Sequence, residues 1–183
     1  MVDRDPAAVE RANSAGVIGI VADATQTAAW RQARLDRARA VVITCNRDDT
    51  ATLATLTARE LNATATIAVA VREGENAHLL SQSGATTVVL SSEAAGRLVG
   101  LATQSPDTIG VLEDLLVAGR GLELVERPVQ ADEVGGPPDP ARCDGLPIAL
   151  VRDGRRIPFD APEFAVVRPG DVVISIAGQP APP

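Results

Sequence analysis

The sequence predicts an α/β protein in which a parallel sheet with helices on both faces is followed by a small β-rich domain. Two observations predict the parallel sheet. Short β-rich runs alternate with helical segments of about 8–13 residues, and each run is almost continuously apolar, as expected for strands covered on both faces. A third observation predicts the second domain, because short β-rich runs separated by Asp-Gly and Pro-Gly pairs fill the end of the chain.

Four apolar runs in the first 90 residues are the expected parallel strands. They are VIGIV (17–21), AVVITC (40–45), TIAVAV (66–71) and TTVVL (86–90). Helices are expected between and after them, at about 26–37, 50–61, 75–83, 93–101 and 106–116.

Local signals mark where some of these helices begin and end. Asp5 is expected to cap a helix that starts at Pro6 and closes at Gly16. Asp48 and Asp49 are interpreted as caps of the helix that follows the expected strand at 40–45.

The remainder of the chain has a different pattern. GLELVERPV (121–129) predicts a strand, and the Gly/Pro-rich stretch 133–145 is either a linker or a loop inside the second domain. A hairpin is expected around Asp153-Gly154 and another around Pro169-Gly170, with 179–183 as a frayed tail.

Composition excludes several classes of function. The net charge is −7, every basic residue is Arg, and aromatic residues make up 2%, so a nucleic-acid polymer is a poor partner. No apolar run approaches the ~18–20 residues of a membrane span, and no signal peptide opens the chain, so a cytoplasmic protein is expected. Cys45 and Cys143 are expected to be reduced thiols, with no metal site and no catalytic triad.

Two acidic residues suggest a nucleotide site. Asp3 ends a short apolar start and precedes a capped helix, which is where a dinucleotide-binding unit places the acid that binds ribose. Asp23 follows the next strand, where a carboxylate can accept a hydrogen bond from adenine. Taken alone, both are more often turn or cap residues. The glycine loop belongs some 20 residues before the acid, so Met1 is expected to be an internal or misassigned start.

The combined pattern resembles the RCK family (regulator of potassium conductance, or TrkA-type). The runs VDRDP, GIVADAT, AVVITCNRDD, AVAVRE and SGATTVVLSSE are similar to its nucleotide-binding domain, and IALVRDGRRIPFDAPEFAVVRPGDVVISIAG is similar to its C-terminal domain. The resemblance implies a truncated Rossmann-like sheet, because the family's first strand, glycine loop and first helix do not precede Asp3. It divides the chain into a nucleotide-binding domain (1–104), a connecting or dimerisation helix (105–119), a C-terminal domain (120–178) and a tail (179–183).

The resemblance also implies a function and a site. The family is not enzymatic; it gates potassium channels and transporters from the cytoplasm, binds NAD(H), ADP/ATP or other effectors, and assembles as dimers and octameric rings. The pore is either fused upstream or a separate membrane subunit. The implied nucleotide site comprises Asp3, Arg4, Asp23, Ala24, Thr25, Thr44, Asn46 and Arg72, and a possible effector cleft comprises Ile148, Arg152 and Pro158.

Within that site, Asp3 would bind ribose, Asp23 and the Ala24 backbone would bind adenine, and Thr44 with Asn46 would line the rest of the cleft. Arg72 would approach the phosphates or a neighbouring subunit, or would be a solvated charge at a strand end. Without the first strand, the sheet is expected to fall into two pieces with unpaired edges, separating the strands at 17–21 and 40–45, and nucleotide binding is expected to be weak.

One alternative function remains open. It is a small NAD(P)-dependent oxidoreductase, disfavoured by the lack of Tyr or paired His and by the missing phosphate loop. A phosphate-accepting receiver-like domain is excluded because the chain contains no Lys.

Overall fold

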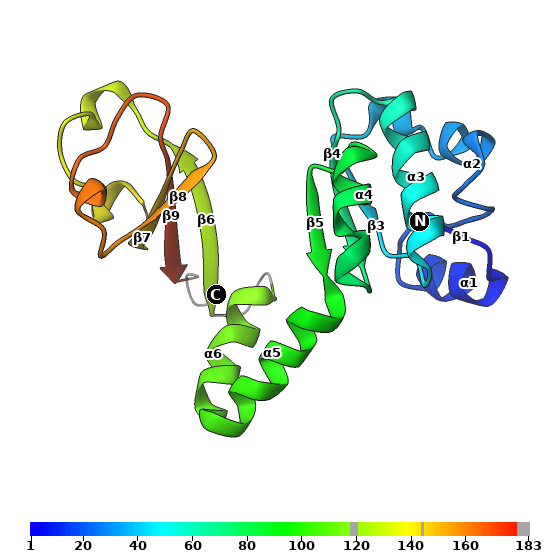
Figure 1. Ribbon diagram of the computed structural model, residues 1–183, viewed down its shortest axis with the longest axis horizontal. Coiled ribbons are helices and arrows are strands. Elements are labelled where there is room, and N and C mark those ends of the chain that lie inside the picture. Colours follow the sequence, from blue (N-terminus) through cyan, green and yellow to red (C-terminus); the bar gives the residue numbers. More distant parts are fainter. Residues whose placement is uncertain (118–120, 144, 179–183) are drawn as a thin grey trace. The chain divides into compact units, whose positions relative to one another are not determined.

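The computed structural model describes residues 1–117, 121–143 and 145–178 of the 183-residue chain. The chain divides into two compact units, Met1–Val99 and Gly100–Pro183 (Figure 1). Within the described ranges, no helix combines the length and the apolar character needed to cross a bilayer.

The first unit contains a parallel sheet in two pieces. Its strands are β1 (Val2–Asp3), β2 (Ile20–Val21), β3 (Ala40–Ile43), β4 (Thr66–Val71) and β5 (Thr87–Leu90). β1 pairs with β2, and β3, β4 and β5 pair in that order, all in parallel. The predicted parallel α/β architecture and the predicted break in the sheet are therefore both confirmed; the break lies between β1 and β3.

A helix follows each of these strands. They are α1 (Pro6–Ser14), α2 (Thr27–Gln32), α3 (Asp48–Leu61), α4 (Ala77–Gln82) and α5 (Ser91–Gln104), with 3₁₀ turns at Leu35–Arg37 and Gly74–Asn76. The signals for the first helix are confirmed: Asp5 Oδ1 accepts the Ala7 N–H at 2.9 Å, and Gly16, just beyond the helix, has φ +83°.

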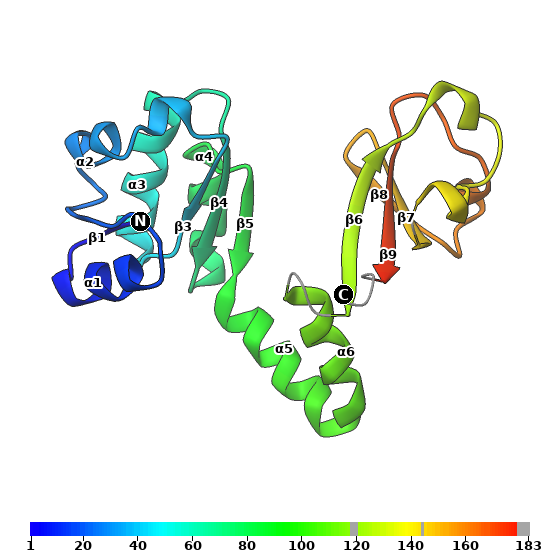
Figure 2. The same ribbon diagram turned by 180° about the vertical axis from the view of Figure 1, so that it is seen from behind.

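The core of this unit lies between the three-stranded piece and helices α3 and α4, which cover the same face of it (Figures 1 and 2). The alanines of α3 are fully buried against the strands, whereas Leu53 and Leu56 of the same helix are half exposed. Small residues therefore allow α3 to approach the sheet closely. On the other sheet face, Val42 and Val89 are 73% and 46% exposed.

Two predicted elements of the first unit are shorter than expected. The strand predicted at 17–21 is confined to Ile20–Val21. The Gly19 N–H donates to Asn13 Oδ1 of α1 at 2.8 Å, so that group is bonded to a side chain and not to a neighbouring strand. The helix predicted at 26–37 is interrupted at Arg34, whose φ of +56° is incompatible with a continuous right-handed helix.

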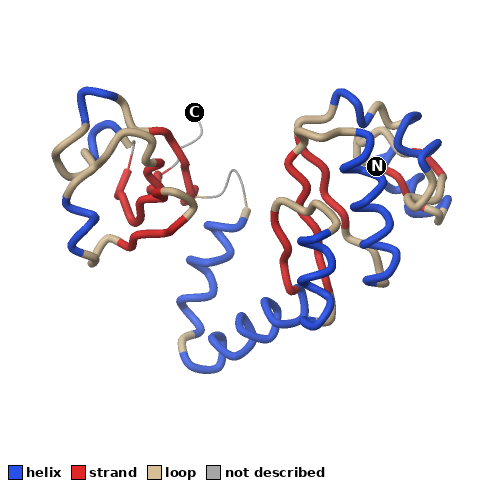
Figure 3. The backbone as a smooth tube through the Cα atoms, turned by 45° about the horizontal axis from the view of Figure 1, so that its top comes forward, coloured by secondary structure: helices blue, strands red, loops and turns tan. Residues whose placement is uncertain are grey.

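The second unit contains α6 (Pro106–Leu116) and an antiparallel sheet of order β6-β9-β7-β8, and strands and loops make up most of the rest (Figure 3). The strands are β6 (Leu122–Pro128), β7 (Gly145–Arg152), β8 (Arg155–Pro158) and β9 (Val172–Gly178), with 3₁₀ turns at Ala131–Glu133, Pro140–Arg142 and Pro162–Ala165. Leu150, Ile157, Val167, Val173 and Cys143 form its core.

One of the two predicted hairpins is present. β7 and β8 pair around Asp153 and Gly154, whose φ values of 51° and 75° fit a tight turn. The hairpin predicted around Pro169-Gly170 is wrong, because the residues before that turn form no strand and β9 pairs with β6 and β7 instead. Val167 exchanges backbone hydrogen bonds with Gly135 and Gly136, so the Gly/Pro-rich stretch is a loop within this unit and not a linker. The tail predicted at 179–183 lies outside the described residues.

Candidate functional site

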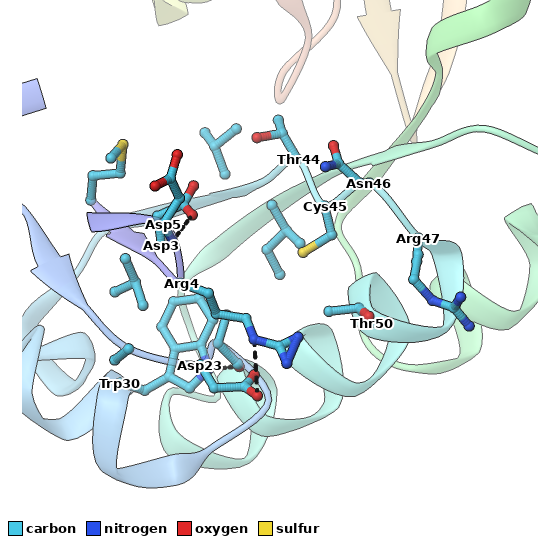
Figure 4. Close-up of a pocket in the computed structure, with 16 residues that line it drawn as sticks. Asp3, Arg4, Asp5, Asp23, Trp30, Thr44, Cys45, Asn46, Arg47 and Thr50 are labelled. Atoms are coloured by element: carbon cyan, nitrogen blue, oxygen red, sulfur yellow. Dashed lines mark hydrogen bonds and ion pairs between the residues drawn. The ribbon is translucent and has the colours of Figure 1, made fainter. Parts of the chain in front are cut away.

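A pocket of about 520 Å³ lies between the two pieces of the parallel sheet (Figure 4). β1 and the residues after it form one wall, the loop after β2 and the indole of Trp30 contribute to another, and the end of β3 forms the third. Because parallel strands end at a common edge, the polar residues that follow β1, β2 and β3 reach the same cavity.

Asp3 is held at this edge by a local hydrogen bond. Its Oδ1 accepts the Asp5 N–H at 2.9 Å, and Asp5 in turn caps α1. Among the described residues, no donor contacts the other carboxylate oxygen of Asp3. That oxygen is therefore available to a ligand hydroxyl.

Asp23 is an oriented and ionised acceptor. Its Oδ1 accepts the backbone N–H of Thr25 at 2.9 Å and the Thr25 hydroxyl at 2.8 Å. These two hydrogen bonds, followed by the Arg4 charge, lower the pKa of Asp23. Asp23 Oδ2 lies 3.5 Å from Arg4 Nε, and the side chain of Arg4 is 70% exposed (Figure 4). A ligand can therefore compete for Oδ2 at little cost.

Trp30 fixes the loop that carries Asp23. It lies on α2, is 8% exposed, and its Nε1 donates a 2.6 Å hydrogen bond to the Ala24 carbonyl. The indole thus ties the pocket wall to the core. It is also the only Trp in the chain.

The third wall comprises Thr44, Cys45 and Asn46 at the end of β3. Burial, followed by the charges of Asp3 and Asp23, raises the pKa of the Cys45 thiol. The thiol is therefore protonated at neutral pH, which makes it a polarizable wall and not a nucleophile.

The match to known families settles the assignment of this unit. The model of the TrkA-N domain family matches residues 1–91. Residues 1–91 form a TrkA-N domain. The family resemblance seen in the sequence is thereby confirmed. No curated protein sequence matches the chain.

Solved structures share the fold at low sequence identity. The TrkA-N domain of the inner membrane protein YbaL from Escherichia coli is 18% identical, with a TM-score of 0.51 over 54% of this chain and 73% of that one. The human SLO3 gating ring is 15% identical, with a TM-score of 0.71 over 98% of this chain and 39% of that one. The NAD(P)-binding domain of an exopolyphosphatase-related protein from Archaeoglobus fulgidus is 22% identical, with a TM-score of 0.50 over 56% of this chain and 77% of that one.

The TrkA-N pocket brings together most of the residues predicted from the sequence. Asp3, Arg4, Asp23, Ala24, Thr44 and Asn46 all line it. Two predicted residues, Thr25 and Arg72, do not line the pocket. Thr25 donates hydrogen bonds that orient Asp23. The Arg72 backbone N–H donates to Asp48 Oδ1 at 3.0 Å.

Sequence reasoning missed several wall residues of the TrkA-N pocket, among them Trp30, Arg47 and Thr50. The position of Arg47 between the end of β3 and the start of α3 could have indicated that residue. No signal in the sequence indicates Trp30 or Thr50 as wall residues.

Neither Asp48 nor Asp49 caps α3, contrary to the prediction, because Arg47 is at the N-cap position and no side chain caps the helix. The Asp48 carboxylate accepts the backbone N–H groups of Arg72 and Glu73, each at 3.0 Å, and the Asn76 side-chain amide at 2.8 Å. Burial raises the pKa of Asp48, but these hydrogen bonds outweigh it and the net pKa is lowered. Asp48 therefore ties the end of β4 to α3.

The residues expected to form an effector cleft lie in the second unit. Arg152 donates from Nε to Asp171 Oδ1 at 2.9 Å, and from Nη2 to Asp171 Oδ2 at 2.7 Å and the Val166 carbonyl at 2.9 Å. Its guanidinium is thus occupied within the fold. Ile148 is half-buried on β7 and Pro158 is exposed on β8.

Proposed function

We propose that this protein is a cytoplasmic regulatory module in which an adenine nucleotide, NAD(H) or ADP/ATP, binds the TrkA-N pocket and biases the gating of a potassium channel or transporter. The observation that carries the proposal is the convergence of two carboxylates, Asp3 and Asp23, from the ends of neighbouring strands on one pocket. The TrkA-N family membership of this unit supports the choice of ligand.

The chemistry of each wall fits a different part of an adenosine group. The free oxygen of Asp3 accepts hydrogen bonds from ribose hydroxyls, as acids at this strand end do in dinucleotide sites. Asp23 Oδ2 accepts from the adenine amino group, with the Ala24 backbone beside it. Thr44 and Asn46 contact the remainder of the ligand.

The lining residues include no His, Tyr or Lys that would act as a general acid or base. This composition favours a regulatory role over the alternative of a small oxidoreductase.

Gating would follow from a population shift. A nucleotide that binds one conformation of an oligomer more tightly than another changes their ratio by its differential affinity. Exposed apolar residues on α6 support assembly with a second copy, because Val111 and Leu116 are 49% and 69% exposed. The fold shared with the SLO3 gating ring supports the partner class, a potassium channel or transporter whose pore is fused upstream or separate, and supports dimers or octameric rings.

Trp30 provides the test. Its emission is titrated with ADP, ATP and NADH, and isothermal titration checks each apparent affinity. Because the sheet is broken at the pocket, we expect weak binding, with a Kd of ~0.1–1 mM. Asp3→Ala and Asp23→Ala should each weaken binding by roughly 5- to 150-fold, as expected for a lost charge-assisted hydrogen bond of about 1–3 kcal/mol.

Asp36→Ala is the matched control, because Asp36 is an exposed carboxylate of the same unit whose nearest cation is Arg34 at 3.6 Å. It should leave the affinity unchanged. Micromolar binding by this chain would contradict the expected weak affinity, and binding that survives both pocket substitutions would contradict the site.

A further inference from the structure

The segment between the end of α2 and the start of β3 concentrates positive charge in an acidic chain. Residues 31–39 include one acid, Asp36, and four arginines, here called the basic patch: Arg31, Arg34, Arg37 and Arg39. The segment therefore has a charge of +3, whereas the whole chain has a net charge of −7 and the remaining residues carry −10. All four arginines are exposed.

The backbone of this segment is fixed by its apolar residues. Leu35 is 3% exposed, and Ala38 packs against the core of the first unit. The buried side-chain amide of Asn62 donates to the carbonyls of Leu35 and Ala38, at 2.8 and 3.0 Å. Because Ala38 is extended and faces the core, Arg37 and Arg39 on either side of it turn toward solvent. The basic patch is thus held on a fixed backbone with its side chains directed outward.

The charges of the basic patch are hardly compensated within the fold. Among the described residues, no ion pair or side-chain hydrogen bond involves Arg31, Arg37 or Arg39. Arg34 Nε lies 3.6 Å from Asp36 Oδ1, and both of these side chains are more than half exposed. A pair of this kind contributes little and is readily exchanged for another anion. The four guanidinium groups are therefore available to an external partner.

The surroundings of the basic patch indicate what kind of anion it fits. Among the described residues, no exposed large apolar side chain lies between Val21 and Val42, whereas the centres of protein interfaces are rich in apolar and aromatic side chains. The adjacent Trp30 is buried and donates to the Ala24 carbonyl, so it offers no ring for stacking on nucleobases. Guanidinium groups bind phosphate oxygens in a bidentate manner. The basic patch therefore fits a surface of phosphate groups that demands no apolar or stacking contact.

We infer that the basic patch docks the first unit onto anionic phospholipid headgroups. The inference goes beyond the proposed function and takes from it only the nearness of a membrane, because a module of a channel or transporter works at the inner face of a bilayer. The cytoplasmic leaflet has a negative surface potential that attracts basic clusters. Since the rest of the chain is negatively charged and is repelled by such a surface, docking through this patch also fixes an orientation.

Docking at this place does not require the nucleotide pocket to be covered. Arg39 directly precedes β3, and Thr44 of the pocket wall directly follows it. The two residues thus lie at opposite ends of one strand, which spans roughly 13 Å at about 3.3 Å per residue. Lipid binding and nucleotide binding can therefore be measured independently.

The test is co-sedimentation of the full chain with vesicles of phosphatidylcholine, alone or with about one third phosphatidylglycerol. At low salt, partitioning into the anionic vesicles should be roughly 100-fold stronger, as expected for a charge of +3 at about 5-fold per charge. It should fall to the neutral level in ~0.5 M salt, because salt screens exposed charges. Arg37→Gln combined with Arg39→Gln should weaken partitioning about 30-fold.

Arg156→Gln combined with Arg168→Gln is the matched control. Both arginines are exposed, neither side chain forms an ion pair or hydrogen bond among the described residues, and the net charge changes by the same amount. This control should partition as the parent does. Arg37→Lys combined with Arg39→Lys keeps the charge and should also retain binding. Nucleotide titration followed by Trp30 emission should be the same in every variant, so a failure of docking would leave the proposed nucleotide site standing.

Four results would overturn the inference. Equal partitioning into neutral and anionic vesicles would show that lipid charge is not recognised. Equal losses in the two double Gln variants would show that net charge, and not the basic patch, governs binding. A DNA duplex that binds as tightly as the vesicles, and through the same arginines, would show that the patch binds any phosphate array. A lipid-free oligomer that dissociates in the Arg37→Gln and Arg39→Gln variant would assign the patch to a second copy of the chain.

Discussion

Removing Asp171 should destabilise the second unit strongly. Its side chain is 1% exposed. The carboxylate accepts hydrogen bonds from Nε and Nη2 of Arg152, at 2.9 and 2.7 Å, and from the Arg168 backbone N–H at 2.8 Å. Asp171→Ala leaves a guanidinium that is 14% exposed without its partner. Breaking such a buried pair costs about 3–5 kcal/mol, because the remaining charge is not compensated. The hydrogen bond from Arg168 is local, so the ion pair with Arg152 sets the larger magnitude.

The assay is urea denaturation followed by hydrogen-exchange mass spectrometry of the β7 and β9 peptides, with Trp30 emission as a readout of the first unit in the same sample. The control is Glu163→Ala, which breaks a 3.0 Å pair with Arg155 whose side chains are 46% and 68% exposed. It should cost at most about 1 kcal/mol. If Asp171→Ala costs no more than Glu163→Ala, the reasoning from burial is wrong.

The ion pair between Asp171 and Arg152 should also make the stability of the second unit depend on pH. The hydrogen bond from Arg152 is the main cause that lowers the pKa of Asp171 in the folded state. A lowered folded pKa contributes stability that is fully present above the unfolded value of about 3.9 and is lost as the pH falls through the folded value. The stability of the second unit should therefore fall less steeply below pH ~4 in Asp171→Ala than in the parent.

Three further predictions concern other parts of the chain. Asn62→Ala should destabilise the first unit by about 2–3 kcal/mol, measured by Trp30 emission in urea, because the buried amide bonds the carbonyls of Leu35 and Ala38 at 2.8 and 3.0 Å; an unchanged midpoint would contradict this. Iodoacetamide should modify Cys45 slowly at pH 8 and faster at pH 10, since its pKa is raised, and bound nucleotide should slow the reaction. Mass spectrometry reads both thiols, with Cys143, 2% exposed, as the unreactive control; equal rates for the two would count against the pocket. Leu116→Glu should shift sedimentation toward a smaller species at tens of micromolar if α6 mediates assembly, and a parent that is already monomeric would refute that role.

Elements defined by local signals could be predicted closely. β4 and α6 have the bounds expected from the sequence, and the turn at Asp153-Gly154 joins the expected strands. Elements whose hydrogen-bond partners lie far along the chain could not be predicted in this way. Val166 and Val167 read as a strand, but Val167 bonds the loop at Gly135–Gly136, and the next strand pairs with β6.

The residues of the candidate site likewise divide into those with a local sequence signal and those without one. Asp3 and Asp23 were identifiable because acids that follow strands carry a positional signal. Trp30 was not, because its role rests on a hydrogen bond to Ala24 that forms only when α2 folds back over the loop. Asp48 was assigned to the wrong partner, since its donors come from the end of β4, far along the chain.

The strands on either side of the break in the parallel sheet, β1 and β3, are short, and this has a consequence for solubility. Long, flat, unpaired edges invite pairing with any other extended chain and so promote fibre formation. β1 has two residues and β3 has four, so few main-chain contacts are available to an adventitious partner. An adventitious strand would therefore be held weakly at either edge. The shortness of β1 and β3 thus protects the open edges of the parallel sheet against self-association.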